Sequence, residues 1–223
     1  IAPPFLPFSE AEIDPLAFNM PPSAKHLLGG DDVGRDVLSR LLYGGRVSLA
    51  VGIFSTAVSV IVGIPLGMLA AFYRGAFEVV VMRLSDIFMS FPSTILILFL
   101  VSMFGPSIIT VTVVIGVLGW PKFARQIYGS VLSIREKDYI EGAVAIGAKD
   151  KLIITRYILP NAVAPIFISI TFRIASAIIL ESSLSFLGMG VQPPAASWGN
   201  MLYNAQSITI LTSRPWMWVP PGL

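Results

Sequence analysis

The chain has 223 residues, of which 55% are hydrophobic and 13% are charged, and its formal net charge is +2. A soluble domain carries about a quarter charged residues. With a mean hydropathy of +0.79, water is excluded as the solvent for most of this surface. The small net charge and the scattered basic residues exclude a nucleic-acid groove. Because cysteine is absent, disulfides and thiol chemistry are excluded, and the one histidine, His26, is expected to be an ordinary loop residue that holds no metal alone.

Residues 1–22 are rich in proline and acidic side chains, which predicts an extended, solvated segment because proline disfavours helix. A short helix is predicted at 33–43, capped by Asp31 or Asp32. Its setting stays open between a membrane interface and a loop packed on protein. The chain begins without an initiator methionine or a visible signal peptide, and it ends on a Pro-Pro-Gly-Leu stretch. We therefore expect that sequence is missing at both ends.

Several apolar stretches are long enough to cross a bilayer, which takes roughly 20 residues as a helix. The predicted spans lie at about 49–72, 79–104, 108–130 and 162–187. Pro65 in the first span predicts a kink, Phe91-Pro92 predicts a bend in the second, and the Gly105-Pro106-Ser107 turn separates the second span from the third. Buried core helices of a soluble protein are the alternative, but four of them in so short a chain leave little polar cover. The membrane interpretation is therefore preferred.

The distribution of lysine and arginine predicts the orientation, because these residues favour cytoplasmic loops. The connection between the third and fourth spans is rich in them, whereas the turn at 105–107 has none. The loop 135–160 is therefore predicted to be cytoplasmic, inside a membrane core at 47–190, with 1–46 and 191–223 on the outer side. Four basic residues before the first span run against this orientation, namely Lys25, Arg35, Arg40 and Arg46.

The cytoplasmic loop contains a run of small residues that lets another backbone approach closely. Gly147 allows a tight turn between two short helices. Ile140 and Val144 are four residues apart and predict one apolar stripe, while Pro160 is expected to stop the second helix. The pattern predicts a compact helical hairpin on the cytoplasmic face. A simple connector between two spans is the alternative.

The spacing Glu141-x-Ala143-x-x-x-Gly147, followed by Leu159-Pro160, resembles the EAA loop of binding-protein-dependent ABC importer permeases. Two more stretches resemble the peptide and nickel branch of that family, and within it the C type subunit of dipeptide and oligopeptide permeases. They are Gly34-Arg35-Asp36-Val37-Leu38-Ser39-Arg40 and Leu184-Ser185-Phe186-Leu187-Gly188-Met189-Gly190-Val191-Gln192-Pro193-Pro194. The resemblance covers about 21–223, and it departs at Gly142, where the family has alanine.

The resemblance implies that this loop holds a coupling helix, which docks into a groove on an ATPase subunit. The residues that it assigns to this contact are Glu141, Gly142, Ala143, Gly147, Ala148, Lys149, Asp150, Leu159 and Pro160. The implied fold is all-α, the polytopic helical bundle of type I ABC importer permeases. Such subunits have six spans, so a core fragment with about four transmembrane helices is expected. Residues 1–3 then resemble the tail of a missing first span, and 220–222 the approach to a missing last one.

The implied function is ATP-driven import of di- or oligopeptides across a bacterial or archaeal inner membrane. The implied partners are a homologous permease subunit, two ABC ATPase subunits, an extracytoplasmic substrate-binding protein and the lipid bilayer. The sequence has no G-x-x-x-x-G-K phosphate loop, so ATP and Mg are expected on the ATPase subunits, with neither cofactor nor catalysis here. Substrates stay open among dipeptides, oligopeptides, glutathione-like molecules and nickel complexes. A passive channel or membrane scaffold is the alternative function, and an intramembrane enzyme is a weaker one.

Ionisable side chains within a span are costly and are therefore functional candidates. Arg83 and Asp86 lie three residues apart near the cytoplasmic end of a span, as an anchoring ion pair or as part of a gate. Arg173 and Glu181 lie about two helical turns apart on the fourth span. They are expected either to line the translocation path or to pair with the partner subunit.

Overall fold

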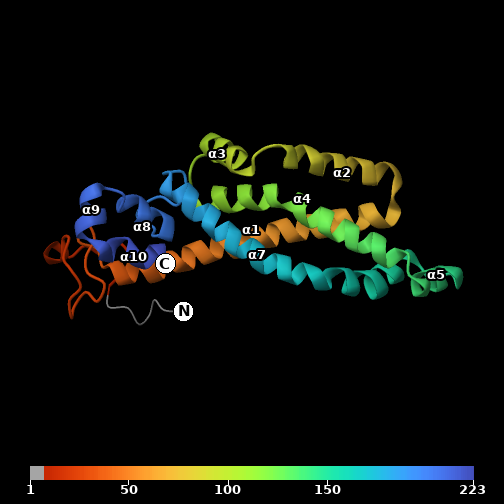
Figure 1. Cartoon of the computed structure of the whole chain (residues 1–223), viewed down its shortest axis with the longest axis horizontal. Helices are drawn as coiled ribbons and strands as arrows, with labels where there is room; N and C mark the ends of the chain where they lie inside the picture. Colours follow the sequence, from red (N-terminus) through yellow and green to blue (C-terminus); the bar gives the residue numbers. More distant parts are fainter. Residues whose placement is uncertain (1–7) are drawn as a thin grey trace. The chain divides into compact units, whose positions relative to one another are not determined.

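The computed structural model describes residues 8–223, and every regular element within them is a helix (Figure 1). The longer helices are α1 (Val37–Tyr73), α2 (Gly75–Ser90), α3 (Ser93–Phe104), α4 (Ile108–Arg135) and α7 (Leu159–Phe186). The short ones are η2 (Pro15–Ala17), α5 (Asp138–Ala145), α6 (Asp150–Leu152), η3 (Ile153–Ile158), α8 (Trp198–Asn204), α9 (Ile208–Ser213), η4 (Pro215–Met217) and α10 (Val219–Gly222). The prediction for residues 1–3 lies outside the described residues.

Three helical runs of the described chain are long and apolar enough to cross a membrane. They are Val37–Tyr73, Ile108–Arg135 and Asp150–Phe186. Helices α2 and α3 meet the same criteria together, although they are bent by 88° where they meet. Up to four spans are therefore present by length and composition. The fold is the all-α bundle that the sequence predicts.

The span predicted at 79–104 is not a single helix. Helix α2 ends at Ser90, and Phe91 is extended, with φ −93° and ψ 142°. Proline disfavours the helical conformation in the residue before it, and Pro92 follows Phe91 directly. The predicted span therefore consists of two helices that meet at a sharp bend.

The short helix predicted at 33–43 is not separate either. Helix α1 runs from Val37 to Tyr73 with Pro65 inside it. Asp36, rather than Asp31 or Asp32, caps its start, because the Asp36 Oδ2 atom accepts a hydrogen bond of 2.7 Å from the backbone N of Ser39. The predicted short helix is thus the first two turns of a much longer one.

Pro160 does not end a helix, in contrast to the prediction. The π-helical segment η3 leads directly into α7, and the backbone N of Leu159 donates to the carbonyl oxygen of Ile154, five residues back. A widened turn of this kind accommodates a residue that has no N–H to give to the preceding turn. The chain therefore runs as one helix from Asp150 to Phe186.

The chain divides into two compact units. The first consists of Ile1–Ile53 (described from Phe8), Leu98–Thr112 and Ser176–Leu223, and the second of Phe54–Ile97 and Val113–Ala175. Helices α1, α3, α4 and α7 contribute residues to both units. The predicted segments 1–46, 47–190 and 191–223 follow the sides of the membrane instead, and they stay predictions.

In the second unit, α1 and α4 approach each other backbone to backbone. A Cβ atom on Gly63 would lie 2.5 Å from the carbonyl oxygen of Trp120, and one on Gly67 would overlap the carbonyl group of Ala124. The Ser59 hydroxyl donates a hydrogen bond of 2.8 Å to the carbonyl oxygen of Gly116 on α4. Small residues allow this close approach, as in other pairs of membrane helices.

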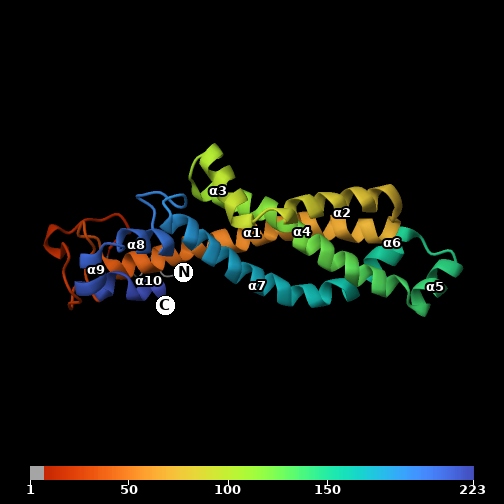
Figure 2. The same cartoon turned by 45° about the horizontal axis from the view of Figure 1, so that its top comes forward.

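A hydrophobic cluster holds the short helices of the second unit against α4. Its buried side chains are Ala71, Phe123, Ile127, Val131, Ile134, Ile140, Ala143, Ile153, Ile158, Ala162 and Ile166. Residues of α5, η3 and the start of α7 therefore share one core with the second half of α4. Figure 2 shows α5 beyond the C-terminal end of α4.

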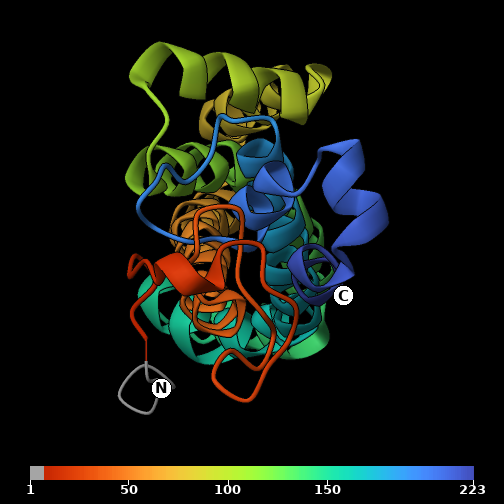
Figure 3. The ribbon, with the colours of Figure 1, turned by 90° about the vertical axis from the view of Figure 1, so that its left-hand side faces the viewer.

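In the first unit, the N-terminal segment lies against the helices that follow α7 (Figure 3). The indole nitrogen of Trp216 donates to the carbonyl oxygen of Gly30 at 3.3 Å, and the backbone N of Ala196 donates to the Glu10 carboxylate at 2.9 Å. The indole nitrogen of Trp198 donates to a carbonyl oxygen of α1 at 3.1 Å. Residues far apart in the sequence are thereby joined in one compact unit.

Candidate functional site

The predicted coupling hairpin consists of α5, a short turn and α6. Gly147 in the turn has φ +78°, a left-handed conformation that glycine adopts without strain. The backbone N of Gly147 donates to the carbonyl oxygen of Val144 at 2.9 Å, and that of Ala148 donates to Ala143 at 3.0 Å. This pair of hydrogen bonds is a glycine C-cap, which satisfies the last carbonyl groups of α5 before the chain turns.

One face of the hairpin is buried and the other is open. Ile140 is 2% exposed and belongs to the hydrophobic cluster of the second unit, whereas Val144 is 58% exposed. Both side chains lie on α5 one turn apart, as the predicted stripe requires, but only Ile140 is covered by the rest of the unit. Ile146, at the end of α5, is 87% exposed. The hairpin is held through its inner face and presents apolar side chains outward.

Most of the other residues assigned to coupling are exposed, whereas Ala143 is buried in the cluster of the second unit. Lys149 is the N-cap of α6, and Asp150 follows in its first turn, where a carboxylate suits the helix dipole. Ala148 and Leu159 are half-buried, and those that are exposed are Glu141, Gly142, Gly147, Lys149, Asp150 and Pro160. Tyr139 and Ile146 are exposed apolar neighbours that the sequence reasoning did not assign to the site. Their signal in the sequence is their position, since Tyr139 precedes the run of small residues and Ile146 lies within it.

The charged pair on α2 has a further partner from another helix. Arg83 Nη1 lies 3.9 Å from Asp86 Oδ2, but Asp86 also forms an ion pair with Arg125 of α4. The side chains of Arg83 and Asp86 are 78% and 43% exposed. Sequence spacing identified the pair within α2, whereas Arg125 is 39 positions from Asp86 and is brought to it only by the packing of the helices. Both the anchoring role and the gating role of the pair stay predictions.

Arg173 lies between helices of the second unit. Its Nη2 atom donates a hydrogen bond of 2.9 Å to the carbonyl oxygen of Ile115. The guanidinium occupies the space that a side chain at Gly119 would fill, since a Cβ atom there would lie 2.5 Å from Nη2. Its Nε atom is buried and has no hydrogen-bond partner among the described residues. The translocation-path role of Arg173 stays a prediction.

Glu181 is fully buried in the first unit, with 0% exposure. Its two carboxylate oxygens accept hydrogen bonds of 2.7 Å from the hydroxyl groups of Ser48 and Ser185. Arg173 and Glu181, which the sequence analysis grouped together, therefore bind different partners. The sequence reasoning missed both serines, because serine is common at any position of an apolar helix.

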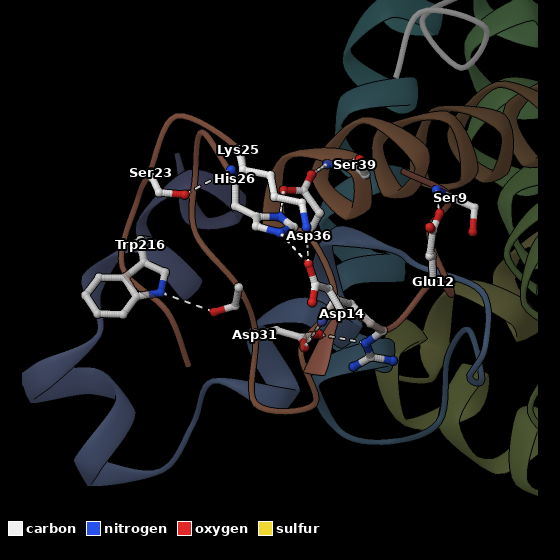
Figure 4. A network of polar contacts seen from close by, with 12 residues as sticks. Ser9, Glu12, Asp14, Ser23, Lys25, His26, Asp31, Asp36, Ser39 and Trp216 are labelled. Atoms are coloured by element: carbon white, nitrogen blue, oxygen red, sulfur yellow. Dashed lines mark hydrogen bonds and ion pairs between the residues drawn. The ribbon is translucent and has the colours of Figure 1, made fainter. Parts of the chain in front are cut away.

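The N-terminal segment holds a buried polar network that the sequence analysis did not predict (Figure 4). His26 is 2% exposed, with its Nδ1 atom 2.9 Å from Asp36 Oδ1 and its Nε2 atom 3.4 Å from Asp14 Oδ2. The expectation that His26 is an ordinary loop residue is therefore wrong. Among residues 8–223, no group of three or more histidine and acidic side chains is placed to hold a metal ion.

Two carboxyl groups of this segment have shifted pKa values. The hydrogen bond from Lys25 Nζ, 2.5 Å long, and that from the backbone N of Leu16 lower the pKa of Asp14 from 3.8 to about 2. Burial, together with the neighbouring charge of Asp31, raises the pKa of Asp32. The network therefore holds a charged Asp14 at neutral pH.

Residues 63–217 match the protein family described as the binding-protein-dependent transport system inner membrane component. The chain belongs to this family. The matched region contains the whole hairpin, the Arg83–Asp86 pair, Arg173 and Glu181.

This inner membrane component is 40% identical over 218 residues to a putative peptide permease protein of Brucella ovis, covering 98% of this chain and 72% of the relative. It is 38% identical to the dipeptide transport system permease protein DppC of Alkalihalophilus pseudofirmus, over 96% of this chain and 70% of that protein. It is 42% identical to the glutathione transport system permease protein GsiD of Pectobacterium atrosepticum, over 86% of this chain and 64% of that protein.

A solved structure shares the fold of this inner membrane component. The inward-facing MetNI methionine ABC transporter gives a TM-score of 0.63 at 22% identity, over 77% of this chain and 86% of that one. This likeness agrees with the importer-permease fold implied by the sequence motifs.

Proposed function

We propose that this inner membrane component forms half of a peptide-importing pathway and docks onto an ABC ATPase through its hairpin. The observation that carries the proposal is the two-sided construction of α5. Ile140 and Ala143 fix it to the helices of the second unit, while Ile146 is left 87% exposed. A force on the open face is thereby passed to the helices, which a flexible connector would not do.

The substrate class rests on the relatives. Two of them are named as peptide and dipeptide permeases, and they are matched over nearly the full length of this chain. The proposed partners are a homologous permease subunit, two ATPase subunits that bind ATP and Mg, and an extracytoplasmic substrate-binding protein. The proposed location is a bacterial or archaeal inner membrane. ATP binding draws the docked hairpins together, and the spans then open the pathway toward the binding protein. Substrate release follows from the lower affinity of the new state.

The docking role is tested by purifying the full-length subunit with its transporter in detergent and measuring how much ATPase is recovered. The variants are Glu141→Lys and Gly147→Trp, with Gly105→Trp as the matched control. Gly105 and Gly147 both have positive φ, and a Cβ atom added to either would meet nothing within 4 Å. Gly105, however, lies in the turn predicted on the opposite side of the membrane. We expect both hairpin variants to lose the ATPase and the control to keep it.

Equal recovery from all variants would contradict docking through the hairpin. Failure of the wild-type subunit to recover any ATPase would favour the passive channel or scaffold. The substrate class is checked separately, by comparing dipeptides, oligopeptides and glutathione as inhibitors of ATP-dependent uptake in proteoliposomes. Competition by glutathione alone would overturn the peptide assignment.

A further inference from the structure

The buried carboxylate of Glu181 has partners on two helices of the first unit. Ser48 belongs to α1, and Ser185 lies one turn further along α7. Each serine donates its hydroxyl hydrogen to one carboxylate oxygen, at 2.7 Å. None of the ion pairs found in the described chain involves Glu181, so its hydrogen-bond partners there are hydroxyl groups. A buried ionisable group of this kind is costly, which makes a specific role the natural expectation.

The two serines also accept hydrogen bonds from backbone amides outside the long helices. The backbone N of Val191 donates to the Ser185 hydroxyl oxygen at 3.0 Å, and that of Trp198 donates to the Ser48 hydroxyl oxygen at 3.4 Å. Each serine hydroxyl thus accepts a hydrogen bond from an amide and donates its own hydrogen to Glu181. Two chains of hydrogen bonds therefore run from backbone amides through serines to one carboxylate.

Val191 lies in the connection between α7 and α8, residues 187–197, and Trp198 is the first residue of α8. We call residues 187–198 the α7–α8 loop. It is packed tightly at the same place, since a Cβ atom on Gly190 would lie 2.5 Å from the Cα atom of Ser185. Ala196 of the loop also donates its backbone N–H to Glu10, at 2.9 Å. The loop thus joins α7, α1 and the N-terminal segment in one unit.

We propose that Glu181 is a positioning residue for transport, whose carboxylate fixes the α7–α8 loop on α1 and α7 so that a substrate-binding protein meets a pre-formed surface. The proposal rests on the proposed function, in which this loop lies on the outer side. It differs from the path-lining role predicted from sequence, because both carboxylate oxygens are already bound within the chain. The carboxyl group is needed because both of its oxygens accept a hydrogen bond here, whereas an amide has only one acceptor oxygen.

The test uses the complete transporter in lipid nanodiscs, with its ATPase subunits, and titrates in the substrate-loaded binding protein. The variants are Glu181→Gln, Ser48→Ala and Ser185→Ala. Ser183→Ala is the matched control, because its exposed hydroxyl donates only to a carbonyl of its own helix, that of Ile179 at 2.8 Å. For each variant, the basal ATPase rate, the stimulated maximum and the half-saturating concentration of binding protein are measured.

We expect Glu181→Gln to raise the half-saturating concentration about tenfold, the change that corresponds to the loss of one hydrogen bond. Basal ATPase should stay within about twofold of wild type, since the hairpin is untouched. Ser48→Ala and Ser185→Ala should each raise the half-saturating concentration as well. When either is combined with Glu181→Gln, the fold-increase should be smaller than the product of the two single fold-increases. A lower melting temperature with an unchanged half-saturating concentration would overturn the positioning role.

Hydrogen exchange separates this role from the proposed function. The amides of Val191 and Trp198 should be protected in the wild-type transporter and exchange faster in Glu181→Gln, with no change for Ser183→Ala. Unchanged exchange at both amides would show that Glu181 does not hold the loop through the two serines. A different outcome is that Glu181→Gln speeds exchange at both amides while the wild-type ATPase does not respond to binding protein. The proposed function and the transport role of Glu181 would then both be wrong, but the role of Glu181 in holding the loop would stand.

Discussion

His26 and Asp36 are joined by a hydrogen bond of 2.9 Å, and Asp36 also caps the first turn of α1 through its other carboxylate oxygen. One buried carboxylate thus links the N-terminal segment to the start of a long membrane helix. His26 lies between Asp36 and Asp14, and its ring stacks on that of Phe8 at a centroid distance of 4.6 Å.

Replacing His26 with alanine should destabilise the start of α1. The change leaves Asp36 Oδ1 without its donor inside a buried site, which costs about 1–3 kcal/mol. We expect a lower melting temperature and faster hydrogen exchange at residues 37–41. Leu27→Ala serves as the control, because Leu27 is the next residue and is 63% exposed. Equal exchange in the two variants would show that the network does not support the helix.

Acid should loosen the same segment through Asp14. The pKa of this group is lowered by Lys25 from 3.8 to about 2, so its ionised form is favoured by the fold. The stabilisation is complete above the unfolded value of 3.8 and is lost as the pH falls toward 2. We therefore expect the difference in melting temperature between wild type and Asp14→Asn to shrink as the pH falls from 3.8 toward 2. Lys25→Met should move the titration upward, and a difference that is independent of pH would contradict the assignment.

Gly67→Ala should destabilise the second unit. The added Cβ atom would overlap the backbone carbonyl group of Ala124, which cannot rotate away as a side chain could. Forced displacement of packed helices costs about 1–3 kcal/mol. The matched control is Gly129→Ala on α4, where nothing lies within 4 Å of the new atom and helix propensity favours alanine by up to about 1 kcal/mol. The melting temperatures should therefore move in opposite directions.

Ile146→Asp should weaken ATPase docking and leave the fold intact. Ile146 is 87% exposed, so its loss removes little within the chain, while an apolar anchor at an interface contributes about 2 kcal/mol, or roughly 30-fold in affinity. Titration of the purified ATPase onto the reconstituted permease subunit measures this change. Ile140→Ala is the counterpart, because its buried side chain should instead lower the melting temperature. Unchanged ATPase affinity in Ile146→Asp would remove this residue from the interface.

The sequence was informative wherever the cause of a structure is local. Long apolar runs identified α1, α4 and α7, and the small residues around Gly147 indicated the turn after α5. Local causes also explain two departures, since Pro92 bends the second predicted span and the π-helical turn before Pro160 lets a helix continue. Pro92 carried this signal from the start, because it disfavours helix in the residue before it.

Tertiary partners could not be predicted in the same way. The pairing of Asp86 with Arg125, and of Glu181 with Ser48, joins residues that are 39 and 133 positions apart. Nothing in the spacing of such residues reveals which helices become neighbours. The burial of His26 is a further case, because two carboxylates and a phenylalanine ring surround it only in the folded segment.

The glycine-lined contact between α1 and α4 limits how the second unit can change shape. Where backbones touch without intervening side chains, sliding one helix past the other brings carbonyl groups into collision. The two helices are therefore expected to turn as one body. Rearrangement in this unit is therefore expected where helices meet through side chains. Asp86 of α2 is an example, because it can exchange Arg125 of α4 for Arg83 of its own helix without a movement of the backbone.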